Sequence, residues 1–162
     1  MVAVFARVAI YTPLTPVPFT LQPMAIMLTG LMLGPNLGAL ALLEYLAAGA
    51  LGAPVFAGGN GGWLYLAHTP TLGYLLSYPV AVYVVGRIAE AARMEYWRLL
   101  VAALAGLVII YLGGNAYLSL WLHTGAMQTL LLGAGVFIGL DSLKAVLAAG
   151  VARTTRWRPA LF

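Results

Sequence analysis

The sequence contains no cysteine and very few charges, with only four acidic and eight basic side chains in 162 residues. The lack of cysteine excludes disulfides, thiolate metal sites and cysteine nucleophiles. Charged residues make up 7% of the chain and hydrophobic residues 63%, whereas soluble domains carry about 25% charged residues. This composition argues against soluble and disordered classes. It predicts an all-α membrane protein with several spans, organised as one domain over residues 1–162.

Catalytic motifs are also missing. Ser77, Ser119 and Ser142 have no glycine elbow or adjacent histidine. His68 and His123 lie far apart, with no carboxylate or cysteine at metal-ligand spacing. No phosphate-binding loop is present, so ATP-driven work would belong to another chain. We therefore expect no enzyme activity and no cofactor.

Apolar stretches separated by proline and glycine predict six transmembrane helices, because about 20 residues cross a bilayer. Residues 13–18 are expected to be extended, and residues 34–38 to form a tight turn. Ala126–Val136 is interpreted as a separate apolar segment before the last helix, and Gly113-Gly114-Asn115 as a close-packing or kinked point. The expected helices are Met1–Tyr11, Phe19–Leu33, Ala39–Leu51, Leu72–Ile88, Leu99–Trp121 and Gly139–Arg153.

Basic residues are unevenly placed along the chain. The loops 13–18, 52–71 and 122–138 contain no lysine or arginine. Cytoplasmic loops of membrane proteins carry the excess of basic residues. The pattern predicts cytoplasmic N- and C-termini and an extracytoplasmic 52–71 loop, and it explains the net charge of +4 without a nucleic-acid partner. The basic clusters are Arg87, Arg93 and Arg98, and Arg153, Arg156 and Arg158.

The stretch Gly52–Gly62 is rich in glycine and interrupts the apolar sequence. Glycine permits positive φ and close backbone approach, and such non-helical backbone lies in a membrane protein only where protein buries it or it lines a cavity. We interpret this glycine loop as one wall of a binding site. The alternative is an ordinary solvent-exposed loop between two helices.

Two acidic positions stand out. Asp141 is expected in the first turn of the last helix, where the helix dipole favours an acid, and Lys144 shares its helix face. Together they form a candidate ligand site, or alternatively a self-contained surface ion pair. Glu44 lies within a predicted span and is interpreted as paired with Arg7 or as a protonated acid packed between helices. One or two of the tyrosines at positions 74, 78, 111 and 117 are candidates to wall an apolar ligand.

Several motifs in order resemble the BioY family, the biotin-binding S components of energy-coupling-factor (ECF) transporters. They are Pro16-Val17-Pro18-Phe19-Thr20-Leu21-Gln22, Leu33-Gly34-Pro35, Pro54-Val55-Phe56-Ala57-Gly58-Gly59, Gly73-Tyr74-Leu75 and Asp141-Ser142-Leu143-Lys144. The likeness runs from about Pro13 to Ala152, nearly the whole chain.

The resemblance implies a six-helix protein of the bacterial inner membrane that captures biotin near the outer face. A transmembrane coupling subunit and two ATPase subunits would drive its release. Asp141 and Lys144 would serve the biotin head groups, the loop residues Phe56, Gly58, Gly59 and Asn60 would close the site, and Phe19, Gln22 and Tyr74 would line it. The competing hypotheses are an S component for another vitamin and a non-transporting membrane scaffold.

Overall fold

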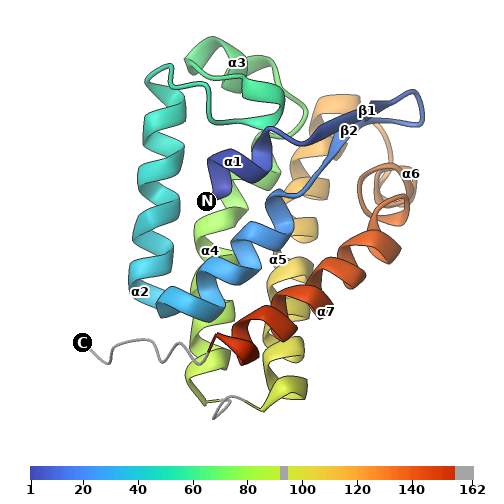
Figure 1. The fold of residues 1–162 in the computed structure, drawn as a ribbon. Helices are drawn as coiled ribbons and strands as arrows, with labels where there is room; N and C mark the ends of the chain where they lie inside the picture. The colour runs from blue at the N-terminus through green and yellow to red at the C-terminus, as the bar shows by residue number, and fades with distance from the viewer. Residues whose placement is uncertain (92–94, 156–162) are drawn as a thin grey trace.

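The fold is that of a computed structural model, which describes residues 1–91 and 95–155. Most of the fold is helical, and the helices lie side by side (Figure 1). A β-hairpin and the short helix α3 (Trp63–His68) lie at one end, and the end of α4 (Leu72–Ala91) and the start of α5 (Tyr96–Leu122) lie at the other (Figure 1). Arg87 lies near the end of α4, Arg98 in the first turn of α5 and Arg153 in the last turn of α7 (Ile138–Thr154). Arg93, Arg156 and Arg158 of the predicted basic clusters lie outside the described residues.

The N-terminal segment is not the single helix predicted over Met1–Tyr11. Helix α1 covers only Val2–Ala6, and strands β1 (Ala9–Thr12) and β2 (Thr15–Thr20) follow as an antiparallel hairpin. Ala9 pairs with Thr20 and Ile10 with Phe19. Two prolines fit in β2 because a two-stranded sheet leaves each strand an edge that needs no N–H donor. The hairpin brings Phe19 and Thr20 to the start of the next helix.

Helix α2 (Gln22–Ala50) contains the turn predicted at residues 34–38, but in a much shorter form. Only Gly34 leaves the helical conformation, with φ 75° and ψ −175°, and Pro35 starts the second arm at once. The two arms run in different directions (Figure 1). Gly86 of α4 packs directly against Gly34 and Pro35, where a Cβ would overlap the Pro35 backbone. Glycine therefore allows α4 to close on the bend.

Helices α4 (Leu72–Ala91) and α5 (Tyr96–Leu122) agree with the predicted spans. Between α2 and α4 lie the 3₁₀ turn η1 (Ala57–Gly59) and helix α3 (Trp63–His68). The glycines at 113 and 114 mark close packing, because α5 continues through them without a break. The ring of Tyr74 lies where a Cβ of Gly114 would be. This contact holds Tyr74 between α4 and α5.

The last third of the chain folds as predicted. Helix α6 (Ala126–Leu130) and the π-helical turn η2 (Leu131–Gly135) form the separate apolar segment. Helix α7 (Ile138–Thr154) follows at an angle of 47° and carries Asp141 in its first turn. By length and hydropathy, α2, α4 and α5 can each cross a membrane, and the bent pair α6–α7 adds a fourth candidate among the described residues. The chain is thus a multi-pass membrane protein, and the predicted count of six spans is not confirmed.

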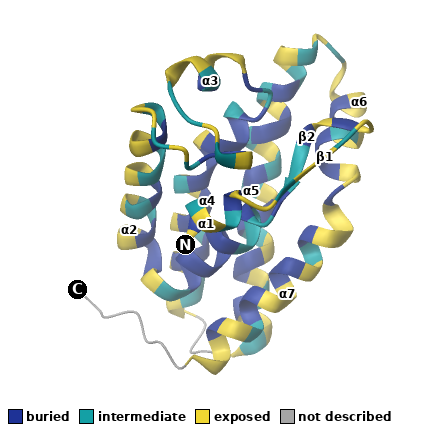
Figure 2. Ribbon diagram, turned by 45° about the horizontal axis from the view of Figure 1, so that its top comes forward, coloured by how far each residue is buried: buried dark blue, intermediate teal, exposed yellow. Residues whose placement is uncertain are grey.

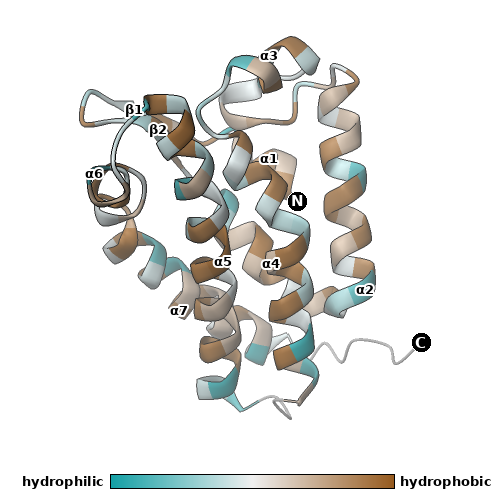
Figure 3. Ribbon diagram, turned by 180° about the vertical axis from the view of Figure 1, so that it is seen from behind, coloured by the Kyte–Doolittle hydropathy of each residue, from teal (hydrophilic) through white to brown (hydrophobic). Residues whose placement is uncertain are grey.

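Apolar side chains cover the outside of the helices as well as their interior. Exposed residues follow the outer faces of the helices (Figure 2), and brown, hydrophobic colouring continues along them (Figure 3). Leu40, Val80 and Leu112 are among the exposed apolar side chains. Such a surface suits lipid, since a soluble protein rarely exposes apolar area on this scale.

The structure supports neither interpretation of Glu44, as a partner of Arg7 or as an acid packed between helices. It is exposed on the second arm of α2, among the exposed Leu40 and Leu43. The described residues form three ion pairs, and Glu44 belongs to none of them. Arg7 instead lies against Gly59 of the glycine loop.

Candidate functional site

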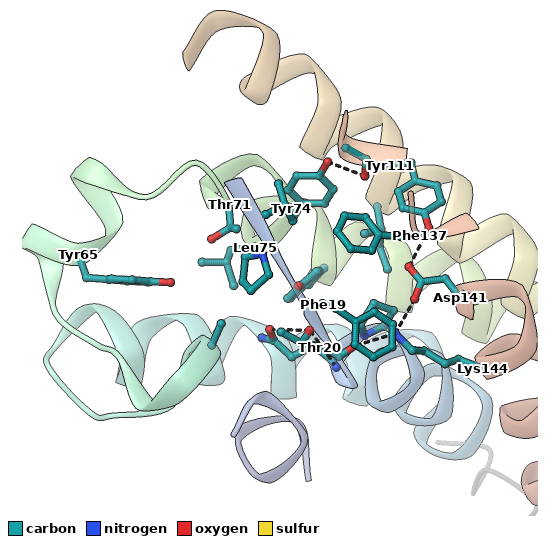
Figure 4. Close-up of a pocket in the computed structure, with 18 residues that line it drawn as sticks. Phe19, Thr20, Tyr65, Thr71, Tyr74, Leu75, Tyr111, Phe137, Asp141 and Lys144 are labelled. Carbon is teal, nitrogen blue, oxygen red and sulfur yellow. Dashed lines mark hydrogen bonds and ion pairs between the residues drawn. The ribbon is translucent and has the colours of Figure 1, made fainter. Parts of the chain in front are cut away.

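A cavity of about 50 Å³ lies where the hairpin, α2, α4, α5 and α7 meet, and we call it the inner cavity. Its walls are mainly aromatic and apolar, and its charged groups gather at one end (Figure 4). Of the nine predicted site residues, the structure brings five together here: Phe19, Gln22, Tyr74, Asp141 and Lys144.

Asp141 and Lys144 form the charged end of the inner cavity. The Lys144 Nζ lies 2.5 Å from Asp141 Oδ1, and the two residues are only 5% and 4% exposed. The pair is therefore buried, so the alternative of a surface ion pair is wrong. Charges buried this deeply need additional partners, because their mutual attraction alone does not offset the loss of water.

Those partners come from two other parts of the chain, the hairpin and α5. Lys144 Nζ donates to the carbonyl oxygen of Thr20 at 2.6 Å and lies 3.8 Å from the ring centroid of Phe19. The Tyr111 hydroxyl donates to Asp141 Oδ2 at 2.7 Å. The ion pair thus joins α7 to the hairpin and to α5.

This arrangement leaves hydrogen-bonding capacity on both charged groups. An ammonium has three donors and a carboxylate about four acceptor positions. Lys144 uses two donors, on Thr20 and Asp141, and Asp141 receives one bond on each oxygen. One donor and further acceptor positions therefore remain side by side for a ligand group that offers both.

The aromatic walls are held in place by contacts between distant segments. Tyr74 donates to the carbonyl oxygen of Gly133 at 3.0 Å. Phe19 and Phe137 stack with ring centroids 6.4 Å apart. Tyr78 and Tyr111 also line the inner cavity, and Tyr117 does not. The sequence reasoning missed Phe137 and Thr20, although Phe137 lies one helical turn before Asp141 and could have been found by that spacing.

Gln22 links the inner cavity to the glycine loop. Its side-chain nitrogen donates to the Tyr45 hydroxyl at 2.9 Å, and that hydroxyl donates to the carbonyl oxygen of Val55 at 2.9 Å. Thr20 donates to the Gln22 side-chain oxygen at 3.2 Å. The chain of hydrogen bonds connects the hairpin, α2 and the loop.

The other four predicted residues lie apart from the inner cavity. Phe56 is fully buried beside Gly49, between Tyr45 and Tyr65, with ring centroids 5.6 and 5.8 Å away. From the loop, Ala57 lines the inner cavity instead.

Gly58 and Gly59 have φ of 69° and 84°, and Tyr11 and Arg7 pack against them. Asn60 donates to the carbonyl oxygen of Ala57 at 2.7 Å and lines a second cavity of about 330 Å³, which we call the outer cavity.

An apolar helical bundle with an aromatic cavity and a buried acid–amine pair defines a membrane protein that encloses a small molecule with a polar end. The family model described as the BioY family matches residues 1–160. The chain belongs to the BioY family.

Relatives and a solved structure agree with this assignment. The chain is 40% identical over 139 residues to a "probable biotin transporter BioY" of Pyrococcus horikoshii, covering 85% of this chain and 79% of that protein. It is 39% identical over 140 residues to the "biotin transporter BioY" of Thermotoga maritima, covering 86% and 81%. The crystal structure of an "S-component for biotin from an ECF-type ABC transporter" superposes with a TM-score of 0.86 at 27% identity, covering 97% of this chain and 87% of that one.

Proposed function

We propose that this chain captures biotin at the outer face of the bacterial inner membrane and is the substrate-binding subunit of an ECF transporter. The observation that carries the proposal is the buried Asp141–Lys144 pair, hydrogen-bonded by Tyr111, at one end of an aromatic cavity. The names of the relatives and of the solved structure give the ligand.

The direct contact between Asp141 and Lys144 favours a shared role at one end of the ligand. Biotin has a fused ring system whose cyclic urea offers N–H donors beside a carbonyl acceptor. We propose that Asp141 accepts a urea N–H and that the remaining Lys144 donor binds the urea oxygen. The aromatic walls then enclose the apolar rings. Phe19, Gln22 and Tyr74 line that part of the site, and the acid tail points toward the glycine loop.

The glycine-loop residues have a supporting role in this proposal. Phe56 packs behind Tyr65, and Gly58 and Gly59 let Tyr11 and Arg7 approach the loop. We propose that Phe56, Gly58 and Gly59 hold the loop over the site, and that Asn60 contacts the ligand from the outer cavity.

Transport needs other chains. A transmembrane coupling subunit and two ATPase subunits would supply the energy, because no phosphate-binding loop occurs in this sequence. We propose no catalytic step and no cofactor for this chain. We propose that the end of the molecule formed by the last turns of α4 and α7 and the start of α5 faces the cytoplasm, which the basic residues there support.

Calorimetry with biotin and the purified protein tests the proposal. We expect tight binding by the unchanged chain and a loss of about 100-fold or more for Asp141→Asn and for Lys144→Ala, since each leaves a buried polar group unpaired. Glu95→Gln and Arg98→Ala are matched controls, because these residues form an exposed ion pair of the same spacing.

Three results would contradict the proposal. Unchanged affinity in both site variants would remove the pair from the site. Tighter binding of another vitamin in competition would keep the scaffold and change its ligand, and a protein that binds no small molecule but retains its partner complex would be a scaffold only.

A further inference from the structure

Arg7 is an exception to the charge distribution of this protein. Arg87, Arg98 and Arg153 lie near the end of α4, at the start of α5 and in the last turn of α7, and Lys144 is buried. Arg7 instead follows α1 directly, is exposed, and lies against the glycine loop. The positive-inside rule predicts few basic residues at an extracytoplasmic end. An exposed arginine beside this loop therefore needs a local explanation.

Glycine at position 59 lets the Arg7 guanidinium reach the loop backbone. A Cβ at Gly59 would lie 3.0 Å from Arg7 Nη1 and 3.5 Å from its Cζ. Within residues 1–91 and 95–155, Arg7 takes part in none of the three ion pairs. Neither the hairpin segment 8–20 nor the loop 52–71 contains an aspartate or glutamate. In the described part of the chain, the guanidinium thus lies in surroundings that offer it no anionic partner.

Two further hydrogen-bond donors lie at the adjacent glycine of the loop. A Cβ at Gly58 would lie 2.9 Å from the Tyr11 hydroxyl and 3.6 Å from Asn60 Nδ2. Tyr11 lies at an irregularity in the register of the hairpin, and such bulges redirect a side chain. Asn60 Nδ2 uses one N–H on the carbonyl oxygen of Ala57, so a second N–H remains. We call Arg7, Tyr11 and Asn60 the loop donors.

The loop donors border the part of the ligand site that is farthest from the ion pair. Tyr65 lies across the inner cavity from Asp141 and Lys144 (Figure 4). Tyr65 also lines the outer cavity, together with Tyr11 and Asn60. A ligand whose ring system is bound by the ion pair therefore extends past Tyr65 toward the loop donors.

Arg7 approaches this region from its edge. Arg7 contacts Gly59, next to Asn60, and does not itself line the outer cavity. Only the end of a bound ligand thus comes within its reach. A guanidinium binds a carboxylate with two parallel N–H donors, and hydroxyl and amide donors add to such a site. The loop donors therefore fit a ligand that ends in a carboxylate.

We propose that Arg7, assisted by Tyr11, binds the carboxylate at the end of the ligand's acyl tail and makes the protein select an acid over its neutral derivative. This inference rests on the proposed function, with biotin as the ligand. It gives the two ends of the ligand to different parts of the chain, since Asp141 and Lys144 bind the ring system and Arg7 binds the tail.

Calorimetry with biotin and with biotinamide, its neutral amide, tests the role of Arg7. The unchanged chain should bind biotin about tenfold more tightly than biotinamide, because only biotin offers a charged partner to Arg7. Arg7→Gln should weaken biotin binding by about tenfold and change biotinamide binding by less than about twofold. Arg7→Lys should keep part of the preference, because it retains the charge without the fork of donors.

Two further variants sharpen the comparison. Tyr11→Phe should weaken biotin binding by about threefold, because it removes one neutral donor. Arg87→Gln is the matched control, since Arg87 is an exposed arginine on α4 that lines neither cavity. We expect Arg87→Gln to bind both ligands as the unchanged chain does.

Each outcome separates this inference from the proposed function. Equal losses for biotin and biotinamide in Arg7→Gln would overturn it, because Arg7 would then only hold the loop through its contact with Gly59. Unchanged binding of both ligands would also overturn it and leave the proposed function standing. Retained biotinamide binding shows that the variant is folded. If the unchanged chain binds neither ligand, the proposed function fails as well.

Discussion

Two ion pairs of this protein have the same spacing and opposite surroundings. Lys144 and Asp141 on α7 are three residues apart, and so are Arg98 and Glu95 at the start of α5, with N···O distances of 2.5 and 2.9 Å. The side chains of the first pair are each 6% exposed and those of the second are each 52% exposed. Local sequence produces both pairs in the same way, and only the segments packed around them differ.

The surroundings determine what each pair can do. Water screens an exposed pair, whose contribution to stability is about 0–1 kcal/mol. The buried pair has lost that water and depends on Thr20, Tyr111 and the Phe19 ring for its remaining interactions. A pair held in this state is ready to exchange some of its contacts with a ligand.

The largest expected effect comes from removing one buried charge. Lys144→Met leaves Asp141 without its cation and should lower the free energy of unfolding by about 3–5 kcal/mol. The double variant Asp141→Leu with Lys144→Met should recover most of that stability, because no lone charge remains, while binding no biotin. Thermal unfolding and calorimetry on the same samples measure the two properties. A double variant no more stable than Lys144→Met would show that the pair itself stabilises the fold.

Tyr111→Phe tests the support that α5 gives to the buried pair. It removes a hydrogen bond to a charged group, which should cost about 1.5–3 kcal/mol of stability. We also expect about tenfold weaker biotin binding, because the Asp141 carboxylate loses its fixed orientation. Tyr117→Phe removes a hydroxyl from the same helix outside the inner cavity and serves as the control. Equal affinities in the two variants would contradict an orienting role.

Glu44 extends the comparison to an exposed carboxylate on a membrane-spanning helix. Glu44→Leu should raise the free energy of unfolding in lipid by about 1–3 kcal/mol, because a carboxylate facing hydrocarbon is unfavourable. Biotin affinity should not change, since Glu44 does not line either cavity. Thermal unfolding in nanodiscs measures the effect. A loss of stability would indicate that Glu44 contacts a partner in the membrane.

The smallest effect is expected at the exposed pair itself. Arg98→Ala and Glu95→Gln should each change the free energy of unfolding by less than about 0.5 kcal/mol and leave biotin affinity unchanged. Thermal unfolding measures the stability, and calorimetry with biotin measures the affinity. A large change at this pair would remove burial as the explanation for the difference between the two pairs.

Prediction from the sequence succeeded where a strong local signal exists. Gly34-Pro35 breaks α2, and Asp141 lies in the first turn of α7. It failed over Met1–Tyr11, because a short apolar run suits a strand as well as a helix. The hairpin forms there because Ile10 and Ala9 find partners in Phe19 and Thr20, nine and eleven residues further along the chain.

In the candidate site, too, local spacing predicted some features and others depend on distant segments. Spacing along one helix was enough to place Asp141 and Lys144 on a common face. Their burial depends on α5 and the hairpin, through Tyr111 and Thr20, which no local pattern connects to them. Phe56 and Asn60 are four residues apart in the glycine loop, yet one lies in the core and the other on the rim of the outer cavity.

The sequence by itself determined the membrane-embedded helical class, the bend in α2, the break before α7 and the pairing of an acid with an amine on one helix face, because composition and local backbone preferences act within a few residues. Tertiary structure alone decided that this pair is buried and that aromatic rings enclose it. Those features require segments more than 100 residues apart, such as Thr20 and Lys144, to meet, and only packing of the whole chain brings them together.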